Sequence, residues 1–201
     1  MSKVLYIKAN ANDKEKSRTY KISDHFIETY KKNNPNDEII TLDLYEEGID
    51  FLPQGQLNEL HTPKPGEGLD HPILKYAFQF QEADKYVVAA PFWNLSFPAI
   101  LKAYIDYICV TGITFKYTEN GPVGLCQGKK AAYIVARGGS YSEGPGVAFE
   151  MGEKYLRTIF AFLGITDFTT IAAEGLDVIG VDVNKIVENA IEKAQKVAKE
   201  F

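Results

Sequence analysis

Short apolar runs alternate with stretches of helical periodicity along most of the chain. The runs predict five strands, at residues 3–8, 38–44, 86–90, 131–136 and 168–173. The third run is apolar at nearly every position, as expected for a strand whose two faces are both covered. Strands that alternate with helices in this way form a parallel, doubly wound sheet.

The segments between the strands repeat apolar residues at the spacing of amphipathic helices. Helices are predicted for residues 17–32, from Pro98 onward, for residues 149–163 with Gly164 as the stop, and for residues 182–201. Right-handed connections then place helices on both faces of the sheet. The predicted fold class is α/β, with five parallel strands between two helical layers.

Two irregular segments interrupt this alternation. Residues 48–72 contain four glycines and four prolines, and residues 111–128 contain an Asn120-Gly121-Pro122 turn. We interpret both as excursions over one domain, residues 1–201, that line a site rather than link two domains.

The composition of the 201-residue chain excludes several classes of protein. It is 45% hydrophobic and 24% charged, as in an ordinary globular domain. Its 22 basic and 27 acidic side chains give a net charge of −5, so a nucleic-acid-binding module is not expected. No apolar run is long enough to span a membrane, and no signal peptide is expected. Two cysteines, Cys109 and Cys126, are too few for a disulfide scaffold, which favours a cytoplasmic protein.

Ligands of an open parallel sheet bind at the carboxyl ends of its strands. The loop after the first strand, residues 9–19, contains no glycine, so it is neither a dinucleotide fingerprint nor a Walker lysine loop. It leads into Ser17-Arg18-Thr19 at the start of a helix, where unpaired N–H groups favour an anion. Two hydroxyls and a guanidinium there suit a single phosphate monoester. The alternative is that Ser17 merely caps the helix.

Two further loops carry candidate binding residues. The loop after the third strand contains Phe92-Trp93-Asn94-Leu95, in which aromatic rings beside an amide suit a flat heterocycle. Ordinary core packing would explain each ring separately. The loop after the fourth strand contains Gly138 and Gly139, which permit close approach of a ligand to the backbone, although a flexible turn is the alternative.

Other catalytic arrangements are weaker. His25, His61 and His71 lack ligand spacing, so no metal site is predicted. Ser140 and Ser142 lack the glycine-flanked elbow of a serine hydrolase.

Together the loops resemble those of the FMN-dependent NADH azoreductases, a family with a flavodoxin-like fold that is related to the NAD(P)H quinone reductases. The most specific part is the run Phe115-Lys116-Tyr117-Thr118-Glu119-Asn120-Gly121-Pro122. Residues 17–19, 92–95, 137–139 and 163–167 also match. The resemblance implies a homodimeric FMN enzyme that takes electrons from NADH and reduces quinones and aromatic azo bonds by two-electron steps.

The resemblance also implies roles for individual residues. The implied cofactor-binding set is Asn10, Ser17, Arg18 and Thr19 at the phosphate and ribityl chain, Phe92, Trp93, Asn94 and Leu95 along the isoalloxazine, and Ala136, Arg137, Gly138 and Gly139 at its pyrimidine edge. Tyr117, Tyr141 and Phe162 are expected in the substrate pocket, with rings borrowed across a two-fold interface. No catalytic side chain is expected, because the flavin carries the hydride chemistry.

Four positions depart from the family pattern. The family commonly has serine where this chain has Asn10 and Ala136, glutamine where it has Arg18, and histidine near Tyr141. Asn10 still offers hydrogen bonds and Arg18 adds a charge-assisted contact, whereas Ala136 contributes only its backbone.

Two other functions remain open from the residues alone. A flavodoxin-type electron carrier would use its acidic charge to reach basic partners, and a flavin-free interaction domain would bind no cofactor. The chain length, the two irregular segments and the lack of a hydroxyl-rich phosphate loop count against the carrier. The absence of an arginine cluster for a 2′-phosphate favours NADH over NADPH. The expected partners are a second copy of the chain and small aromatic acceptors, with no nucleic acid and no membrane.

Overall fold

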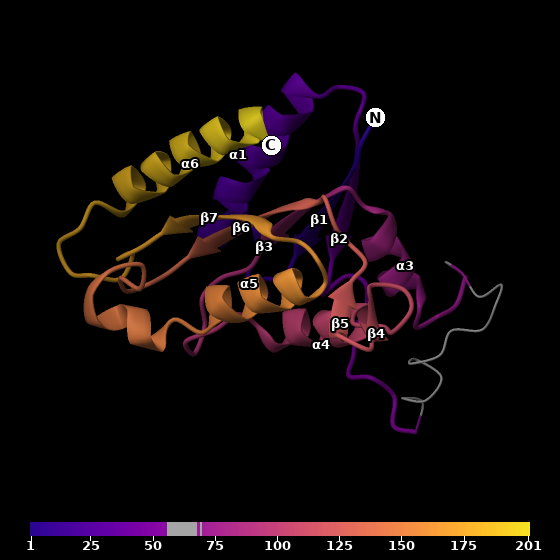
Figure 1. Cartoon of the computed structure of the whole chain (residues 1–201). Helices are drawn as coiled ribbons and strands as arrows, with labels where there is room; N and C mark the ends of the chain where they lie inside the picture. The colour runs from indigo at the N-terminus through magenta and orange to yellow at the C-terminus, as the bar shows by residue number, and fades with distance from the viewer. Residues whose placement is uncertain (56–67, 69) are drawn as a thin grey trace.

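The computed structural model describes residues 1–55, 68 and 70–201 (Figure 1). Its centre is a five-stranded sheet in the order β2-β1-β3-β6-β7, in which every neighbouring pair is parallel. The strands are β1 (Lys3–Lys8), β2 (Glu38–Asp43), β3 (Lys85–Ala89), β6 (Lys130–Ala136) and β7 (Asp167–Ala173). The chain moves outward from β1 to β2 and then returns to β3 on the other side. The carboxyl ends of β1 and β3 therefore flank the switch point at which such sheets bind ligands.

Helices cover both faces of this sheet (Figure 1). One layer is formed by α1 (Arg18–Asn33) and α6 (Val183–Glu200), and the other by α3 (Lys75–Glu82), α4 (Ala99–Ile108) and α5 (Gly152–Phe162). Successive side chains of a strand point to opposite faces, so Val4 and Tyr6 pack beneath α1 and α6. Leu5 and Ile7 pack into the larger core on the other side. The predicted α/β fold with five parallel strands between helical layers is confirmed.

Several elements depart from the sequence-based expectation. The segment 111–128, expected to be irregular, contains an antiparallel hairpin of β4 (Phe115–Thr118) and β5 (Gly121–Gly124). Helix α5 begins at Gly152 rather than at residue 149, because the short 3-10 helix η2 (Gly144–Phe149) precedes it. The structure adds α3 and a second 3-10 turn, η1 (Lys14–Lys16).

Some predictions fall where the structure makes no description. Residues 56–67 and 69 of the predicted 48–72 segment lie outside the described residues, and so does His61. Within the described part of the chain, no helix is long and apolar enough to cross a membrane.

The hairpin packs tightly on the end of α5. A Cβ added at Gly124 would overlap the backbone of Leu163 and Gly164, and the Cys126 N–H donates to the Leu163 carbonyl at 2.9 Å. The absence of a side chain at Gly124 is thus what allows this contact.

We expect Gly124→Ala to lower the free energy of unfolding by about 2–3 kcal/mol, because overpacking against backbone cannot be relieved by a rotamer change. Chemical denaturation measures the change. The control is Gly68→Ala, since an added Cβ at Gly68 meets no described atom within 4 Å. Equal unfolding free energies for the two variants would contradict the packing argument.

Candidate functional site

A cavity of about 270 Å³ opens at the carboxyl ends of β1, β3 and β6. It lies at the switch point of the sheet and brings together nine of the twelve predicted cofactor-binding residues. These nine are Asn10, Ser17, Arg18, Thr19, Phe92, Trp93, Ala136, Arg137 and Gly138.

A second cavity, of about 490 Å³, adjoins the first. It is lined by the three remaining predicted residues, Asn94, Leu95 and Gly139, together with Tyr141. The two cavities share Phe92, Gly138 and Asp177, so they are two parts of one site. We call the first the phosphate-side cavity and the second the ring-side cavity.

Ser17 caps α1 and also faces the phosphate-side cavity. Its Oγ accepts hydrogen bonds from the Tyr20 N–H at 3.0 Å and from Asn10 Nδ2 at 2.7 Å. Both of these bonds use the oxygen as acceptor, so the hydroxyl proton remains free to donate to an anion. The helix cap therefore does not exclude the anion-site interpretation.

Thr19 provides the clearest unused polar group in this cavity. Its side chain is buried, and its Oγ1 has no hydrogen-bond partner among the described residues. A buried hydroxyl without a partner is costly. The first N–H groups of α1 are also without intrahelical partners, and the helix dipole favours negative charge there.

Arg18 lies beside the same cavity and is paired with Asp177. Its Nη1 is 3.1 Å from Asp177 Oδ1, and both side chains are substantially exposed. An exposed pair of this kind adds little to stability, so the guanidinium can exchange partners at low cost. Asp177 was not singled out from the sequence, because it follows the last strand rather than one of the strands at the switch point.

A neighbouring tyrosine supports the backbone at the end of β1. The Asn10 N–H donates to the Tyr20 hydroxyl oxygen at 2.9 Å. Burial raises the pKa of Tyr20, so its hydroxyl stays protonated and neutral. Asn10 is itself buried, which fixes its amide against Ser17.

The loop after β3 is a tight turn. Trp93 and Ser96 exchange backbone hydrogen bonds of 2.7 and 3.0 Å, and the central residues Asn94 and Leu95 have φ of 50° and 68°. Positive φ at both central positions is the geometry of a type I′ turn, and it is strained for leucine. The Leu95 carbonyl accepts from the Met151 N–H at 3.0 Å, which holds the turn to the start of α5.

The glycine loop after β6 is held through its carbonyl groups. The Gly138 carbonyl accepts from the Asp177 N–H at 2.9 Å, and the Gly139 carbonyl accepts from the Gly175 N–H at 3.0 Å. Neither glycine N–H bonds to another described residue. A Cβ at Gly138 would meet the Asp177 carboxylate, which would have to move aside. Two unpaired N–H groups therefore border the site.

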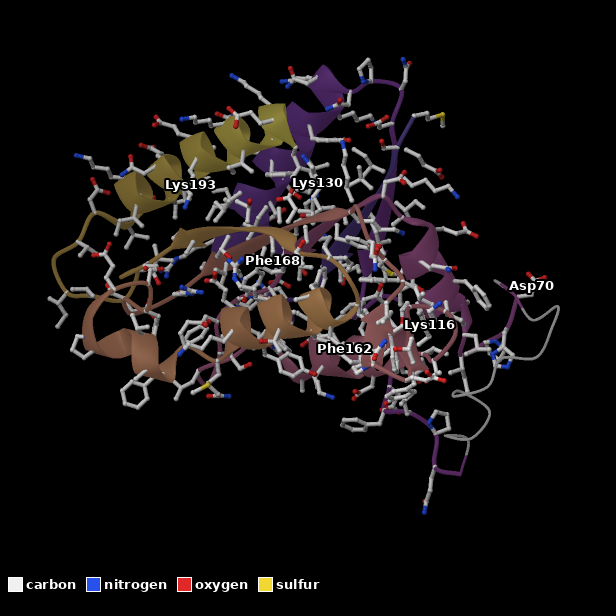
Figure 2. The ribbon with its side chains drawn as sticks, in the orientation of Figure 1. Asp70, Lys116, Lys130, Phe162, Phe168 and Lys193 are labelled. Atoms are coloured by element: carbon white, nitrogen blue, oxygen red, sulfur yellow. The ribbon has the colours of Figure 1, made fainter. Side chains whose placement is uncertain are left out.

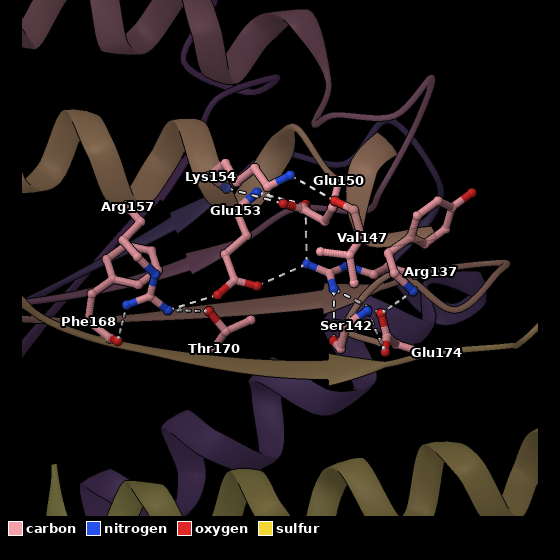
Figure 3. A network of polar contacts seen from close by, with 11 residues as sticks. Arg137, Ser142, Val147, Glu150, Glu153, Lys154, Arg157, Phe168, Thr170 and Glu174 are labelled. Carbon is pink, nitrogen blue, oxygen red and sulfur yellow. Dashed lines mark hydrogen bonds and ion pairs between the residues drawn. The ribbon is translucent and has the colours of Figure 1, made fainter. Parts of the chain in front are cut away.

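Arg137 presents only its backbone to the site. Its side chain has no exposed surface and forms ion pairs with Glu150, Glu153 and Glu174 (Figure 3). These contacts were not predicted from the sequence, since Glu150 follows η2, Glu153 lies in the first turn of α5 and Glu174 follows β7.

Tyr117 and Phe162 lie elsewhere in the same chain. The Phe162 ring packs 4.8 Å from Phe115 in the hairpin, and Tyr117 extends from that hairpin with 70% of its surface exposed. Figure 2 shows Phe162 at the end of α5, near Lys116. Because the 11 residues of α5 span about 16 Å, the two rings are far from the turn at its other end. Of the three predicted substrate-pocket residues, only Tyr141 lines a cavity with the cofactor-binding set.

The described histidines make local contacts. His25 Nδ1 contacts the Lys21 carbonyl oxygen, and His71 Nδ1 accepts from the N–H groups of Ile73 and Leu74 near the start of α3. No group of three or more metal-ligating side chains occurs among the residues the structure describes.

Comparison with known proteins agrees with this geometry. A family described as having a flavodoxin-like fold matches residues 2–198. Over 201 residues, covering 100% of both chains in each case, the protein is 73% identical to FMN-dependent NADH:quinone oxidoreductase 2 of Clostridium acetobutylicum and 62% identical to an FMN-dependent NADH:quinone oxidoreductase of Clostridium perfringens.

Solved structures of similar proteins also match the whole chain. An azoreductase from Bacillus anthracis matches over 100% of both chains with a TM-score of 0.91 and 40% identity. An FMN-dependent NADH-azoreductase from the same species, solved with FMN, matches over 100% of this chain and 99% of the other with a TM-score of 0.88 and 31% identity. The chain therefore belongs to the flavodoxin-like family of FMN-dependent NADH:quinone oxidoreductases and azoreductases.

Proposed function

We propose that the protein is an FMN-dependent NADH oxidoreductase that reduces quinones and aromatic azo compounds. The observation that carries the proposal is the unpartnered, buried Thr19 hydroxyl beside the Ser17 cap, in a cavity also lined by Phe92 and Trp93. Relatives named as oxidoreductases and azoreductases favour this function over that of a flavodoxin-type electron carrier.

The residues of the site fit FMN. Ser17, Thr19 and the first N–H groups of α1 offer donors for one phosphate, and Arg18 adds a positive charge. No glycine follows β1 to admit a pyrophosphate, which fits FMN better than FAD. The free N–H groups of Gly138 and Gly139 suit the polar edge of a heterocycle.

Bound FMN would supply the hydride and two-electron chemistry that links NADH to the acceptor. The protein binds the cofactor and the substrates and orients them. Phe92 and the 93–96 turn supply a rigid apolar wall, and the N–H groups of Gly138 and Gly139 favour negative charge beside them. The chain need not supply an acid or base.

The phosphate assignment is tested by Thr19→Val, which removes the hydroxyl while keeping the shape of the side chain. A hydrogen bond to a charged group contributes about 1.5–3 kcal/mol, so FMN affinity should fall about tenfold to a hundredfold. Fluorescence titration of the cofactor-free protein with FMN measures the dissociation constant.

The matched control is Thr29→Val, on the same helix but outside both cavities. Thr19→Val should leave thermal stability without FMN unchanged or slightly raised, because it removes an unpartnered buried hydroxyl. An unchanged FMN dissociation constant would refute the phosphate assignment, and release of FAD from the purified protein would refute FMN as the cofactor.

We further propose that donor and acceptor use the same space, the ring-side cavity, one after the other. Both would stack on the one face of the flavin ring that these loops leave open, so each would exclude the other. Initial rates over a grid of NADH and quinone concentrations should therefore give parallel double-reciprocal lines, as in ping-pong kinetics. Intersecting lines would show a ternary complex and would exclude a shared site.

The active unit that we propose is a homodimer in which each site borrows rings from its neighbour. Large apolar side chains are exposed around η2 and the start of α5, including Val147, Phe149 and Met151. Tyr117 and Phe162 lie about one helix length from the cavity of their own chain. A second copy related by a two-fold axis would bring them to the ring-side cavity.

For the dimer we expect Phe162→Ala to raise the KM for aromatic acceptors about twofold to tenfold while FMN content stays intact, since aromatic contacts contribute about 0.5–1.5 kcal/mol. Phe51→Ala is the control, because that ring is 78% exposed and lines neither cavity. An active monomer in light scattering at the assay concentration would exclude composite sites.

We propose a cytoplasmic location and a single functional domain. Cys109 and Cys126 are both free thiols, which fits a reducing compartment.

A further inference from the structure

Arg137, next to the glycine loop, forms ion pairs with acids from three other segments of the chain (Figure 3). Its guanidinium lies 2.8 Å from Glu174, 3.3 Å from Glu150 and 3.2 Å from Glu153, and its side chain is completely buried. A charge removed from water is costly unless it is paired and hydrogen-bonded. The three acids fix the guanidinium in place, and the guanidinium in turn fixes them.

Glu174 links Arg137 to the glycine loop by hydrogen bonds. Its Oε1 accepts from Arg137 Nη1 at 2.8 Å and from the Tyr141 N–H at 3.0 Å, and its Oε2 accepts from the Ser142 N–H at 3.3 Å. Burial raises the pKa of Glu174, but the hydrogen bonds from Arg137, Ser142 and Tyr141 outweigh it and hold the pKa below the usual value. The carboxylate is therefore charged at neutral pH, with three donors converging on it.

These bonds set the backbone of the residue whose ring borders the cavity. The Tyr141 ring packs 4.5 Å from the Phe92 ring at an interplanar angle of 49°. The Arg137 guanidinium lies 5.5 Å from the centre of the same Phe92 ring. Each of the four residues Arg137, Glu174, Tyr141 and Phe92 therefore contacts two of the others.

The segment between β6 and η2 has no helical or strand hydrogen bonding of its own. The carbonyl groups of Gly138 and Gly139 hold only its start, and the Glu174 carboxylate accepts from the N–H groups of the next residues with such a bond, Tyr141 and Ser142. These two bonds restrict the backbone at Tyr141 before a ligand arrives, and preorganisation of this kind increases affinity.

We propose that Glu174, held by Arg137, is a positioning residue that sets Tyr141 against Phe92 and thereby determines the affinity for aromatic acceptors. This inference rests on the proposed function, because it assigns the acceptor to the ring-side cavity. Glu174 lines neither cavity itself and acts through Tyr141.

The test is a double-mutant cycle of Glu174→Gln and Tyr141→Ala. Glutamine keeps the shape of Glu174 but turns an amide NH2 group toward N–H donors, which frees the loop. We expect Glu174→Gln to raise the KM for a naphthoquinone about tenfold with kcat changed by less than about twofold. In the Tyr141→Ala background, the same substitution should leave KM unchanged, because the route through Tyr141 is already lost.

The binding step is measured separately from turnover. Trp93 is the one tryptophan of the chain and begins the turn whose residues Asn94 and Leu95 line the ring-side cavity, so quenching of its fluorescence reports naphthoquinone binding to the FMN-loaded protein. The dissociation constant should rise about tenfold in Glu174→Gln and show the same non-additivity. Arg137→Lys, which keeps the charge but loses the planar fork, should reproduce the effect.

Glu143→Gln is the matched control. It lies in the same loop, is exposed, and makes no side-chain hydrogen bond or ion pair with any described residue. It should change neither constant. In Glu174→Gln and Glu143→Gln, rates with ferricyanide, a small acceptor without an aromatic ring, should stay at the level of the unsubstituted protein.

The outcomes separate the two proposals. Failure of the unsubstituted protein to reduce any quinone would refute the proposed function, whereas quenching would still decide the positioning role. A Glu174→Gln variant with unchanged naphthoquinone affinity would overturn the positioning role. The positioning role would also be overturned if Glu174→Gln lowered the affinity equally with and without Tyr141→Ala, because the effect would then not depend on the Tyr141 ring.

Discussion

Unpaired backbone groups in three adjacent loops are the constraint on which the site depends. At the carboxyl edge of a parallel sheet, the chain leaves the ladder of β1, β3 and β6 and loses its regular hydrogen-bond partners. Each loop replaces the lost hydrogen-bond partners in a different way. Ser17 and Tyr20 bond the first loop, a type I′ turn joined to α5 closes the second, and Glu174 accepts from the third. The N–H groups left over, at the start of α1 and at Gly138 and Gly139, face the ligand site.

The fold could be predicted from the sequence because its strands and helices are long and strongly patterned. The loops could be placed because parallel strands bring their carboxyl ends to one edge, so that Asn10, Phe92 and Gly138 meet in one cavity. The hairpin at residues 115–124 was not predicted, since each of its strands has only 4 residues and most of the hairpin is exposed. Its stability comes from contact with the end of α5, which no local signal reports.

The direction in which individual side chains point could not be predicted from the sequence. Arg137 stands in a loop that lines the cavity, and nothing local shows that its guanidinium turns away toward three acids. Those acids lie 13, 16 and 37 positions along the chain. Asp177 likewise reaches Arg18 across 159 positions. Long-range polar pairing depends on how the helices pack on the sheet, so it follows from the fold rather than from sequence spacing.

The charges around Arg137 favour a geometric role over a stabilising one. Arg137 and Arg157 face Glu150, Glu153 and Glu174, so this cluster carries a net charge of −1. The start of α5 balances part of the excess, because the N–H groups of Glu153 and Lys154 donate to Glu150 at 2.8 and 3.2 Å. Apolar side chains of similar volume would often stabilise such a site as well or better. They would offer no acceptor to the N–H groups of residues 141 and 142, and the glycine loop would then lose its fixed shape beside the cavity.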